Sequence, residues 1–226
     1  MFQRGFNTNT VIGNLIIINI LAFIASFVLG KTEVTFCDTY IHAFDTTDYW
    51  LALYLPTSDF FHPWQIVTHM FLHGGLMHLF FNMYALWMFG SVLEQVWGAK
   101  RFLIFYLVCG IGAALIYTAV KYYELQHADA LARCVSEHVP VLGASGAVFG
   151  ILLGFGMLFP NTELMLLFFP IPIKAKYFVI GYGVIELWMG LRNDPTDSVA
   201  HFAHIGGMIF GYILIKLWSK NQNHFY

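Results

Sequence analysis

Two residues with the chemistry of a nucleophile and a base lie at the starts of long apolar stretches. Ser145 lies in the motif G-A-S-G at 143–146, and His204 lies in A-H-I-G-G at 203–207. Serine is a weak nucleophile until a neighbouring base takes its proton, and neutral histidine is the usual base near pH 7. Polar side chains within a potential membrane span are functional by default. The pair therefore predicts acyl transfer through a Ser–His dyad, provided that the two stretches meet.

Attack on a carbonyl also creates an oxyanion, which needs hydrogen-bond donors already in place. His78 and Asn82 are four residues apart, so they share one face of an expected helix and both can donate. The backbone N–H of Ser145 is a further donor, because the first N–H groups of a helix have no intrahelical partner. We expect these groups to form the oxyanion site.

Three carboxylates could in principle orient His204, namely Asp194 and Asp197 in the preceding loop and Glu186 in an apolar stretch. None has the position of a catalytic motif, so we predict a dyad without an acidic third member. Glu186 also fits a second class of function, a proton-coupled transporter, which would use an intramembrane carboxylate together with histidines. Such transporters usually show paired repeats with broken helices, and the sequence has no detectable repeat.

The elements that must position these residues are membrane-spanning helices. Of the 226 residues, 58% are hydrophobic and only 11% are charged, against about 25% charged in soluble domains. A spanning helix needs about 20 mostly apolar residues, which fits six stretches: 11–29, 76–97, 102–121, 142–159, 176–191 and 201–219. We expect an all-α, polytopic membrane protein whose single domain covers residues 1–226. The net charge of −2 gives no indication of nucleic acid binding.

The distribution of lysine and arginine predicts the orientation of these helices. With the N-terminus inside, the cytoplasmic positions are Arg4, Lys100, Arg101, Lys174, Lys176, Lys216 and Lys220. The outer positions are then Lys31, Lys121, Arg133 and Arg192. This imbalance favours both termini in the cytoplasm. The second, fourth and sixth helices then run inward, so their polar first turns lie at one depth below the outer surface.

The connecting segments carry fewer signals. Residues 30–75 form a long loop rich in aromatic side chains, which is typical of a segment in the membrane interface. A short helix is expected within 122–139. Cys37 and Cys134 fall in loops on the same outer side, where a disulfide is open to them, although we favour two free thiols. Cys109 is expected to be a small core residue.

Small residues spaced by four follow both Ser145 and His204. They are Gly146, Gly150 and Gly154 in one stretch and Ala203, Gly207 and Gly211 in the other. Residues at this spacing share a helix face, and in lipid they allow two helix backbones to approach closely. Packing of the two faces would bring the Ser145 hydroxyl within hydrogen-bond reach of the His204 imidazole.

Together these residues resemble the rhomboid family of intramembrane serine proteases. The resemblance rests on G-A-S-G at 143–146, A-H-x-x-G-x-x-x-G at 203–211, H-L-F-F-N at 78–82 and G-x-x-x-E-x-x-x-G at 90–98. It extends over all six stretches, from about residue 11 to residue 219. One difference is Gln65 after Trp64, where many members have an arginine in the first long loop.

The resemblance implies Ser145 as nucleophile, His204 as general base, and His78, Asn82 and the Ser145 amide as oxyanion donors. It implies packing roles for the motif glycines and a structural role for Glu94: the residues concerned are Gly143, Gly146, Gly207, Gly211 and Glu94. Single-span or polytopic membrane proteins would be the substrates, with access near the fifth stretch, and no metal or cofactor would be needed. The bare six-helix core suggests a bacterial inner membrane.

Two other interpretations concern metals and inactive relatives. His69, His73 and His78 have spacings that could place two ligands on one helix face, but no H-E-x-x-H motif occurs, so we expect no catalytic zinc. Polar residues near the outer ends, His69, His73, His78 and His201, could instead line a water-filled cavity. An inactive rhomboid-like protein that binds membrane helices remains a third class of function.

Overall fold

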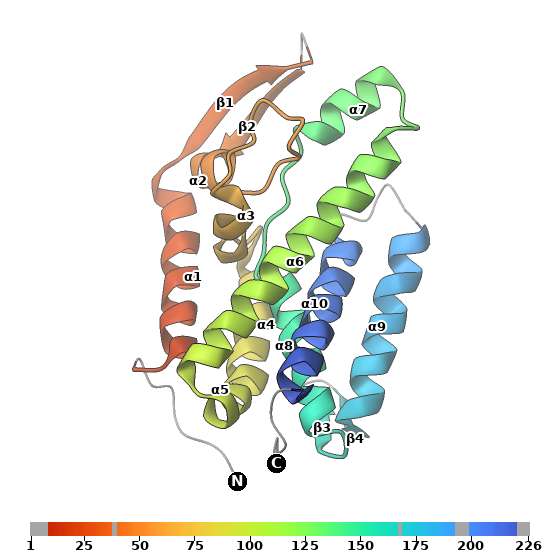
Figure 1. The fold of residues 1–226 in the computed structure, drawn as a ribbon. Coiled ribbons are helices and arrows are strands. Elements are labelled where there is room, and N and C mark those ends of the chain that lie inside the picture. The colour runs from red at the N-terminus through yellow and green to blue at the C-terminus, as the bar shows by residue number, and fades with distance from the viewer. Residues whose placement is uncertain (1–8, 38–39, 167–168, 193–198, 221–226) are drawn as a thin grey trace.

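The computed structural model describes residues 9–37, 40–166, 169–192 and 199–220 of the chain. Arg4, Asp194 and Asp197 lie outside these ranges. Long helices lie side by side in a bundle, with two β-hairpins at opposite ends (Figure 1). The long helices are α1 (Val11–Val28), α6 (Ala99–Leu125), α8 (Ser145–Leu158), α9 (Ala175–Arg192) and α10 (His201–Lys220). A broken helix comprises α4 (Leu76–Ala85), the π-helical turn η2 (Leu86–Gly90) and α5 (Ser91–Trp97).

Within the described residues, four helical segments are long and apolar enough to cross a membrane: Val11–Val28, Leu76–Trp97, Ala99–Leu125 and His201–Lys220. α8 is apolar but shorter, with 14 residues. α9 has 18 residues, and Lys176, Glu186 and Arg192 interrupt its apolar sequence. All six predicted stretches contain helix, and the chain is a multi-pass membrane protein. The predicted short helix after α6 is also present, as α7 (Ala130–Glu137).

The prediction of an all-α fold was wrong in the connecting segments. β1 (Lys31–Phe36) pairs antiparallel with β2 (Tyr40–Asp45), in the register Lys31↔Asp45. β3 (Glu163–Leu166) pairs antiparallel with β4 (Phe169–Lys174) before α9. β1 has the sequence K-T-E-V-T-F, whose alternating polarity and β-branched residues favour a strand. The aromatic content of residues 30–75 concealed this short alternation.

Cys37 and Cys134 form a disulfide, which corrects the expectation of two free thiols. The β1–β2 hairpin brings Cys37 beside α7, with 5.9 Å between the two Cα atoms. The sequence could not show this proximity because 97 residues separate the two cysteines. A crosslink over so long a loop stabilises the fold by about 4–5 kcal/mol on the chain-entropy account. Cys109 is a buried free thiol, as predicted.

The rest of the long loop holds the segment that leads into α8. Its helices are α2 (Thr46–Leu51), α3 (Gln65–Thr68) and the turn η1 (His69–Phe71). Leu53 and Val141 exchange two backbone hydrogen bonds of 2.9 Å, which connects this loop to the chain just before the G-A-S-G motif. The loop therefore supports the approach to Ser145.

Gln65, which follows Trp64 in this loop, is completely buried. Its amide donates to the carbonyl oxygen of Phe60 at 3.0 Å and to that of Trp50 at 3.4 Å. Its side-chain oxygen accepts from the N–H of His62 at 3.0 Å. A neutral amide thus satisfies the buried backbone groups of the loop without burying a charge.

Glu94 joins α5 to the start of α1. Its two carboxylate oxygens accept hydrogen bonds from the N–H groups of Val11 and Ile12, at 2.8 and 3.1 Å. These are first-turn N–H groups without intrahelical partners, and a negative charge at this end of a helix is favourable. The geometry supports the structural role expected for Glu94.

The predicted close approach of α8 and α10 is present. A Cβ atom placed on Gly207 would overlap the carbonyl oxygen of Gly146, and one placed on Gly150 would lie 3.0 Å from the carbonyl oxygen of Gly207. Gly211 also lies near α8, where its Cβ would be 3.4 Å from the Cα of Gly150. The two helices therefore touch backbone to backbone along the glycine faces.

We predict that Gly207→Ala separates α8 from α10 and lowers stability, because its methyl group has no space. Overpacking of this kind typically costs about 1–3 kcal/mol, or a fall of several degrees in the melting temperature. Gly181→Ala on α9 is the matched control, since nothing lies within 4 Å of its added Cβ. Thermal unfolding of both variants in detergent tests this, and equal melting temperatures would contradict it.

Candidate active site

Ser145 and His204 form a hydrogen-bonded pair between the first turns of α8 and α10. The distance from His204 Nε2 to Ser145 Oγ is 2.8 Å. Ser145 is the first residue of α8, and His204 lies in the opening turn of α10. The glycine contact between these helices lies directly below the pair. A hydroxyl in this position can pass its proton to the imidazole when it attacks a carbonyl carbon.

The His204 ring is fixed from two further directions. Its face stacks on Phe149 of α8, with ring centroids 4.2 Å apart and planes inclined by 8°. Its Nδ1 atom lies 2.8 Å from Oε2 of Glu186 in α9. The ring is thus held at its face and at both nitrogens, which orients it towards the Ser145 hydroxyl.

The contact with Glu186 corrects the prediction that His204 has no acidic partner. α9 and α10 are consecutive, so Glu186 near the end of α9 lies level with the first turn of α10. The same Oε2 atom lies 2.7 Å from Nδ1 of His201. The sequence did contain one signal, which is a carboxylate in the helix before α10 at the depth of His204. It did not show which face of α9 carries that carboxylate.

His78 lies against the G-A-S-G motif on the other side of Ser145. A Cβ atom on Gly143 would lie 3.0 Å from His78 Cε1, 3.2 Å from its Nε2 and 3.5 Å from Ser145 Oγ. The backbone of Gly143 also has φ of +134°, which disfavours any side chain. The nearby His78 ring and the positive φ both explain why glycine is needed here. Because Gly143 has no side chain, His78 can lie close to Ser145.

Asn82 is buried one turn below His78 on α4. Its Nδ2 atom donates to the carbonyl oxygen of His78 at 2.9 Å. An amide nitrogen carries two hydrogens, so this bond leaves a second donor on Asn82. The three residues expected to supply oxyanion donors, His78, Asn82 and Ser145, thus lie on α4 and α8 and line the same cavity.

One cavity of about 1390 Å³ contacts Ser145, His204, Glu186, His78 and Asn82. Its remaining lining is largely apolar and comes mainly from α4, η2, α8, β3 and α9. His69 and His73 are buried and do not belong to its lining, so the expectation that they line a water-filled cavity was wrong. His201 borders a separate, smaller cavity.

His69 instead makes hydrogen bonds that connect the G-A-S-G motif to the long loop. Its carbonyl oxygen accepts from the N–H of Gly143 at 2.9 Å, and its Nδ1 lies 2.8 Å from the carbonyl oxygen of Gln65. Burial lowers the pKa of His69 to about 4, and burial together with the nearby His78 lowers that of His73 to about 3. Both rings are therefore neutral at physiological pH.

The described residues include two clusters with metal-ligand chemistry. In the first, Cys37 and Cys134 are joined to each other and offer no thiolate beside His138. In the second, the nitrogens of His201 and His204 lie 2.7 and 2.8 Å from the Glu186 oxygen. Tetrahedral zinc with bonds of about 2.0 Å would hold its ligand atoms roughly 3.3 Å apart. The nitrogen and oxygen atoms of the second cluster are closer together than zinc ligands would be, and their distances are those of hydrogen bonds.

Comparison with known proteins shows the family of this chain. The family described as "Rhomboid domain" matches residues 61–221. Those residues include every helix that contributes a side chain to the site. The chain belongs to the rhomboid family.

Curated relatives include bacterial and mitochondrial proteins. Mitochondrial rhomboid protein 1 of Saccharomyces cerevisiae is 31% identical over 160 residues, which is 70% of this chain and 44% of that protein. Rhomboid protease AarA of Providencia stuartii is 29% identical over 158 residues, 67% of this chain and 54% of its own. Rhomboid protease GluP of Bacillus subtilis is 32% identical over 149 residues, 66% and 25% of the two chains. The chain thus spans between a quarter and about half of these relatives.

The buried His69 predicts loss of stability in acid. Its pKa is about 4 in the folded chain against about 6.5 when exposed. The unfolded chain therefore binds the extra proton between these values, and stability falls as the pH drops from 6.5 towards 4. The expected loss at pH 5 is about 2 kcal/mol.

Thermal unfolding of the wild type and of His69→Asn, at pH 7.5 and at pH 5, tests this prediction. Asparagine cannot titrate, so the variant should lose fewer degrees on acidification than the wild type does. His73 is present in both proteins and cancels in the comparison. An equal loss in the two proteins would show that His69 does not carry the effect.

Proposed function

We propose that this chain is an intramembrane serine endopeptidase that cleaves membrane proteins through Ser145 and His204. The observation that carries the proposal is the 2.8 Å contact between His204 Nε2 and Ser145 Oγ in a cavity among apolar helices. Ser145 Oγ attacks the scissile carbonyl while Nε2 takes its proton. Nε2 then returns the proton to the leaving amine, and water hydrolyses the acyl-enzyme by the same route.

His78, Asn82 and the backbone N–H of Ser145 are the proposed donors to the oxyanion. The lining of the cavity and the contact of His78 with Gly143 support this assignment. In a site of low polarity, each such donor contributes about 10²–10³ to the rate. Gly143 serves this arrangement by leaving space for His78, and Gly146, Gly207 and Gly211 serve it by keeping α8 and α10 in contact.

The proposed topology has six membrane-spanning helices with both termini in the cytoplasm. It adds α8 and α9 to the four segments of spanning length. The start of α1 and the end of α10 lie at the same end of the bundle, which supports termini on one side (Figure 1). A disulfide at the opposite end suits an oxidising outer compartment. Relatives come from bacteria and from mitochondria, so a bacterial inner membrane is not favoured over a mitochondrial one.

The proposed substrates are single-span or polytopic membrane proteins, which would reach the site between α4 and α9. The cavity lies between these helices and is lined by aromatic and aliphatic side chains such as Phe81, Met88, Phe178 and Tyr182. An extended substrate segment could lie along this surface with its carbonyl carbon at Ser145. The chemistry of the two side chains calls for no metal or cofactor.

The alternatives differ in what they require of the same residues. A proton-coupled transporter would need Glu186 as a proton carrier, because the sequence gives this carboxylate no other role. Its bonds to His204 and His201 now provide one. An inactive rhomboid-like binding protein needs no contact between Ser145 and His204, and the test below separates it from a protease.

A serine-directed fluorophosphonate should label the purified wild-type protein, and labelling should be lost in Ser145→Ala and in His204→Ala. Without the serine there is no nucleophile, and without the histidine its proton has no acceptor. Cleavage of a fluorescent single-span substrate should fall by about 10⁴-fold or more in both variants.

Ser26→Ala is the matched control for these variants. Ser26 also lies in an apolar helix, where its hydroxyl donates to the carbonyl oxygen of Phe23 at 2.7 Å. This variant should label and cleave as the wild type does. Labelling that survives in Ser145→Ala would assign the nucleophile elsewhere, and a wild type that neither labels nor cleaves would favour the inactive class.

Filling the cavity should weaken substrate binding without touching the chemistry. Ala85 lines the cavity from the end of α4, so the indole of Ala85→Trp would occupy space proposed for the substrate. We expect KM for the single-span substrate to rise about tenfold, since one or two kcal/mol of apolar contact is lost. Labelling by the small fluorophosphonate should be unchanged. Phe80→Trp, on the same helix but outside the cavity lining, is the control, and similar KM values in both variants would contradict the prediction.

A further inference from the structure

We infer that Glu186 is a positioning residue that makes His204 the base for Ser145, so that the site works as a Glu–His–Ser chain. The inference rests on the proposed function. Its geometric basis is the line of contacts from Glu186 Oε2 to His204 Nδ1 and from His204 Nε2 to Ser145 Oγ, each of 2.8 Å. These contacts join one side chain from each of the helices α9, α10 and α8.

The contact at Nδ1 determines which nitrogen of His204 carries the proton. A carboxylate oxygen can only accept hydrogen bonds, so His204 must donate from Nδ1. The neutral ring then has its lone pair on Nε2, the atom that faces the Ser145 hydroxyl. The opposite tautomer would turn a lone pair on Nδ1 towards the carboxylate and would put a proton on Nε2, which could then not accept the proton of Ser145.

The same carboxylate stabilises the ring after proton transfer. As Ser145 Oγ bonds to the substrate carbonyl carbon, the Oγ proton moves to Nε2 and the carbonyl π electrons move to the oxygen. The ring becomes imidazolium while both its protons remain hydrogen-bonded. A negative charge beside Nδ1 offsets this positive charge strongly where water is scarce. When the peptide C–N bond breaks, Nε2 returns its proton to the leaving nitrogen.

Glu186 is itself held in place by a second donor. His201 Nδ1 lies 2.7 Å from the same oxygen, and only 6% of Glu186 is exposed. An unpaired carboxylate would be costly to bury here, and two N–H donors from α10 offset that cost.

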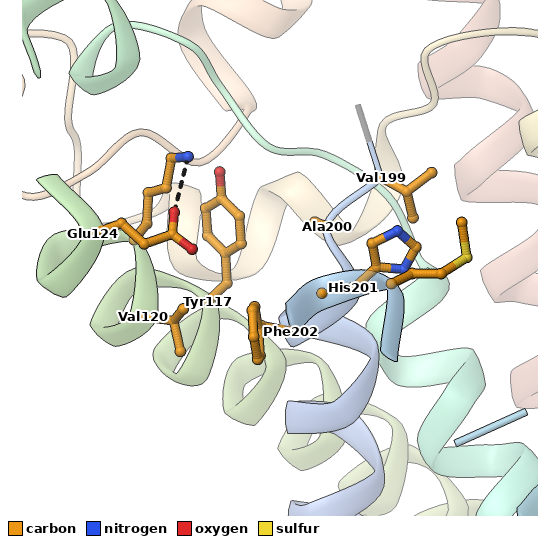
Figure 2. Close-up of a pocket in the computed structure, with 10 residues that line it drawn as sticks. Tyr117, Val120, Glu124, Val199, Ala200, His201 and Phe202 are labelled. Carbon is orange, nitrogen blue, oxygen red and sulfur yellow. Dashed lines mark hydrogen bonds and ion pairs between the residues drawn. The ribbon is translucent and has the colours of Figure 1, made fainter. Parts of the chain in front are cut away.

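A cavity of about 70 Å³ borders His201 away from the catalytic pair, and its wall includes the ion pair of Lys121 with Glu124 on α6 (Figure 2). Among the described residues, the titratable side chains that hydrogen-bond to the Glu186 carboxylate are His201 and His204. His78 lies farther off, across the catalytic cavity on α4. The opposite charges of Lys121 and Glu124 pair with each other, at 3.2 Å.

A purely mechanical role for Glu186 is the rival explanation. Within α9, the buried residues are Ala175, Val179 and Glu186. The bonds of Glu186 to α10 could therefore serve only to keep α9 in place for the substrate. A probe too small to depend on the position of α9 separates the two roles.

The test is the rate of fluorophosphonate labelling in Glu186→Gln. Glutamine keeps the shape of the side chain, but it carries no charge and its NH₂ group can donate to Nδ1, which favours the wrong tautomer. We expect labelling to slow on the order of 10²-fold or more. For the single-span substrate, kcat should fall by a similar factor with KM nearly unchanged. Ile185→Val, at the neighbouring and exposed position of α9, is the matched control and should label at the wild-type rate.

Each outcome has a distinct meaning. Labelling of Glu186→Gln at the wild-type rate, even with slower cleavage of the membrane substrate, would overturn the inference and leave the mechanical role. Failure of the wild type to label would instead refute the proposed function. Should Glu186→Gln not fold, nitrogen NMR of the histidine-labelled wild type decides, with His204→Ala used to assign the signal. A proton on Nδ1 and none on Nε2 supports the inference, and the reverse overturns it.

Discussion

The contact between the backbones of α8 and α10 is the constraint on which the rest of this structure depends. Gly207 lies so close to the Gly146 carbonyl that no side chain fits between them. The first turns of α8 and α10 are therefore only a short distance apart. That distance lets a short serine side chain reach an imidazole on another helix. In lipid, where apolar side chains gain little by leaving their surroundings, such close packing is itself a main source of helix association.

Three polar side chains of this protein, Glu94, Gln65 and Glu186, have hydrogen-bond partners that also connect different parts of the chain. Glu94 accepts from the first turn of α1, and Gln65 satisfies the backbone of the loop above the site. Glu186 accepts from His201 and His204. An unsatisfied polar group would be costly in such an environment, so each partner set also specifies where two segments must meet. Polar pairing here fixes the positions of segments, and apolar packing fills the space between them.

The chemistry of the site arises from the convergence of helix ends. The first turns of α4, α8 and α10 carry His78, Ser145 and His204, and the last part of α9 carries Glu186. Helix N-termini supply unpaired N–H groups, which suits a developing oxyanion. The cavity lies between α4 and α9 and extends from these residues along α8 to β3. The proposed hydrolysis would use this opening at the level of the polar residues.

Local spacing in the sequence was sufficient to predict the helical stretches, the glycine faces and the pairing of Ser145 with His204. The helical stretches follow from the length of the apolar runs, and the glycine faces follow from a spacing of four residues. Neither signal requires knowledge of the fold. Tertiary structure alone decided the disulfide between Cys37 and Cys134 and the contact of Glu186 with His204. Both depend on how one element is rotated and placed against another, which no local period encodes. The short hairpins and the π-helical turn within 76–97 escaped prediction for a related reason, since their few residues were hidden inside longer apolar or aromatic stretches.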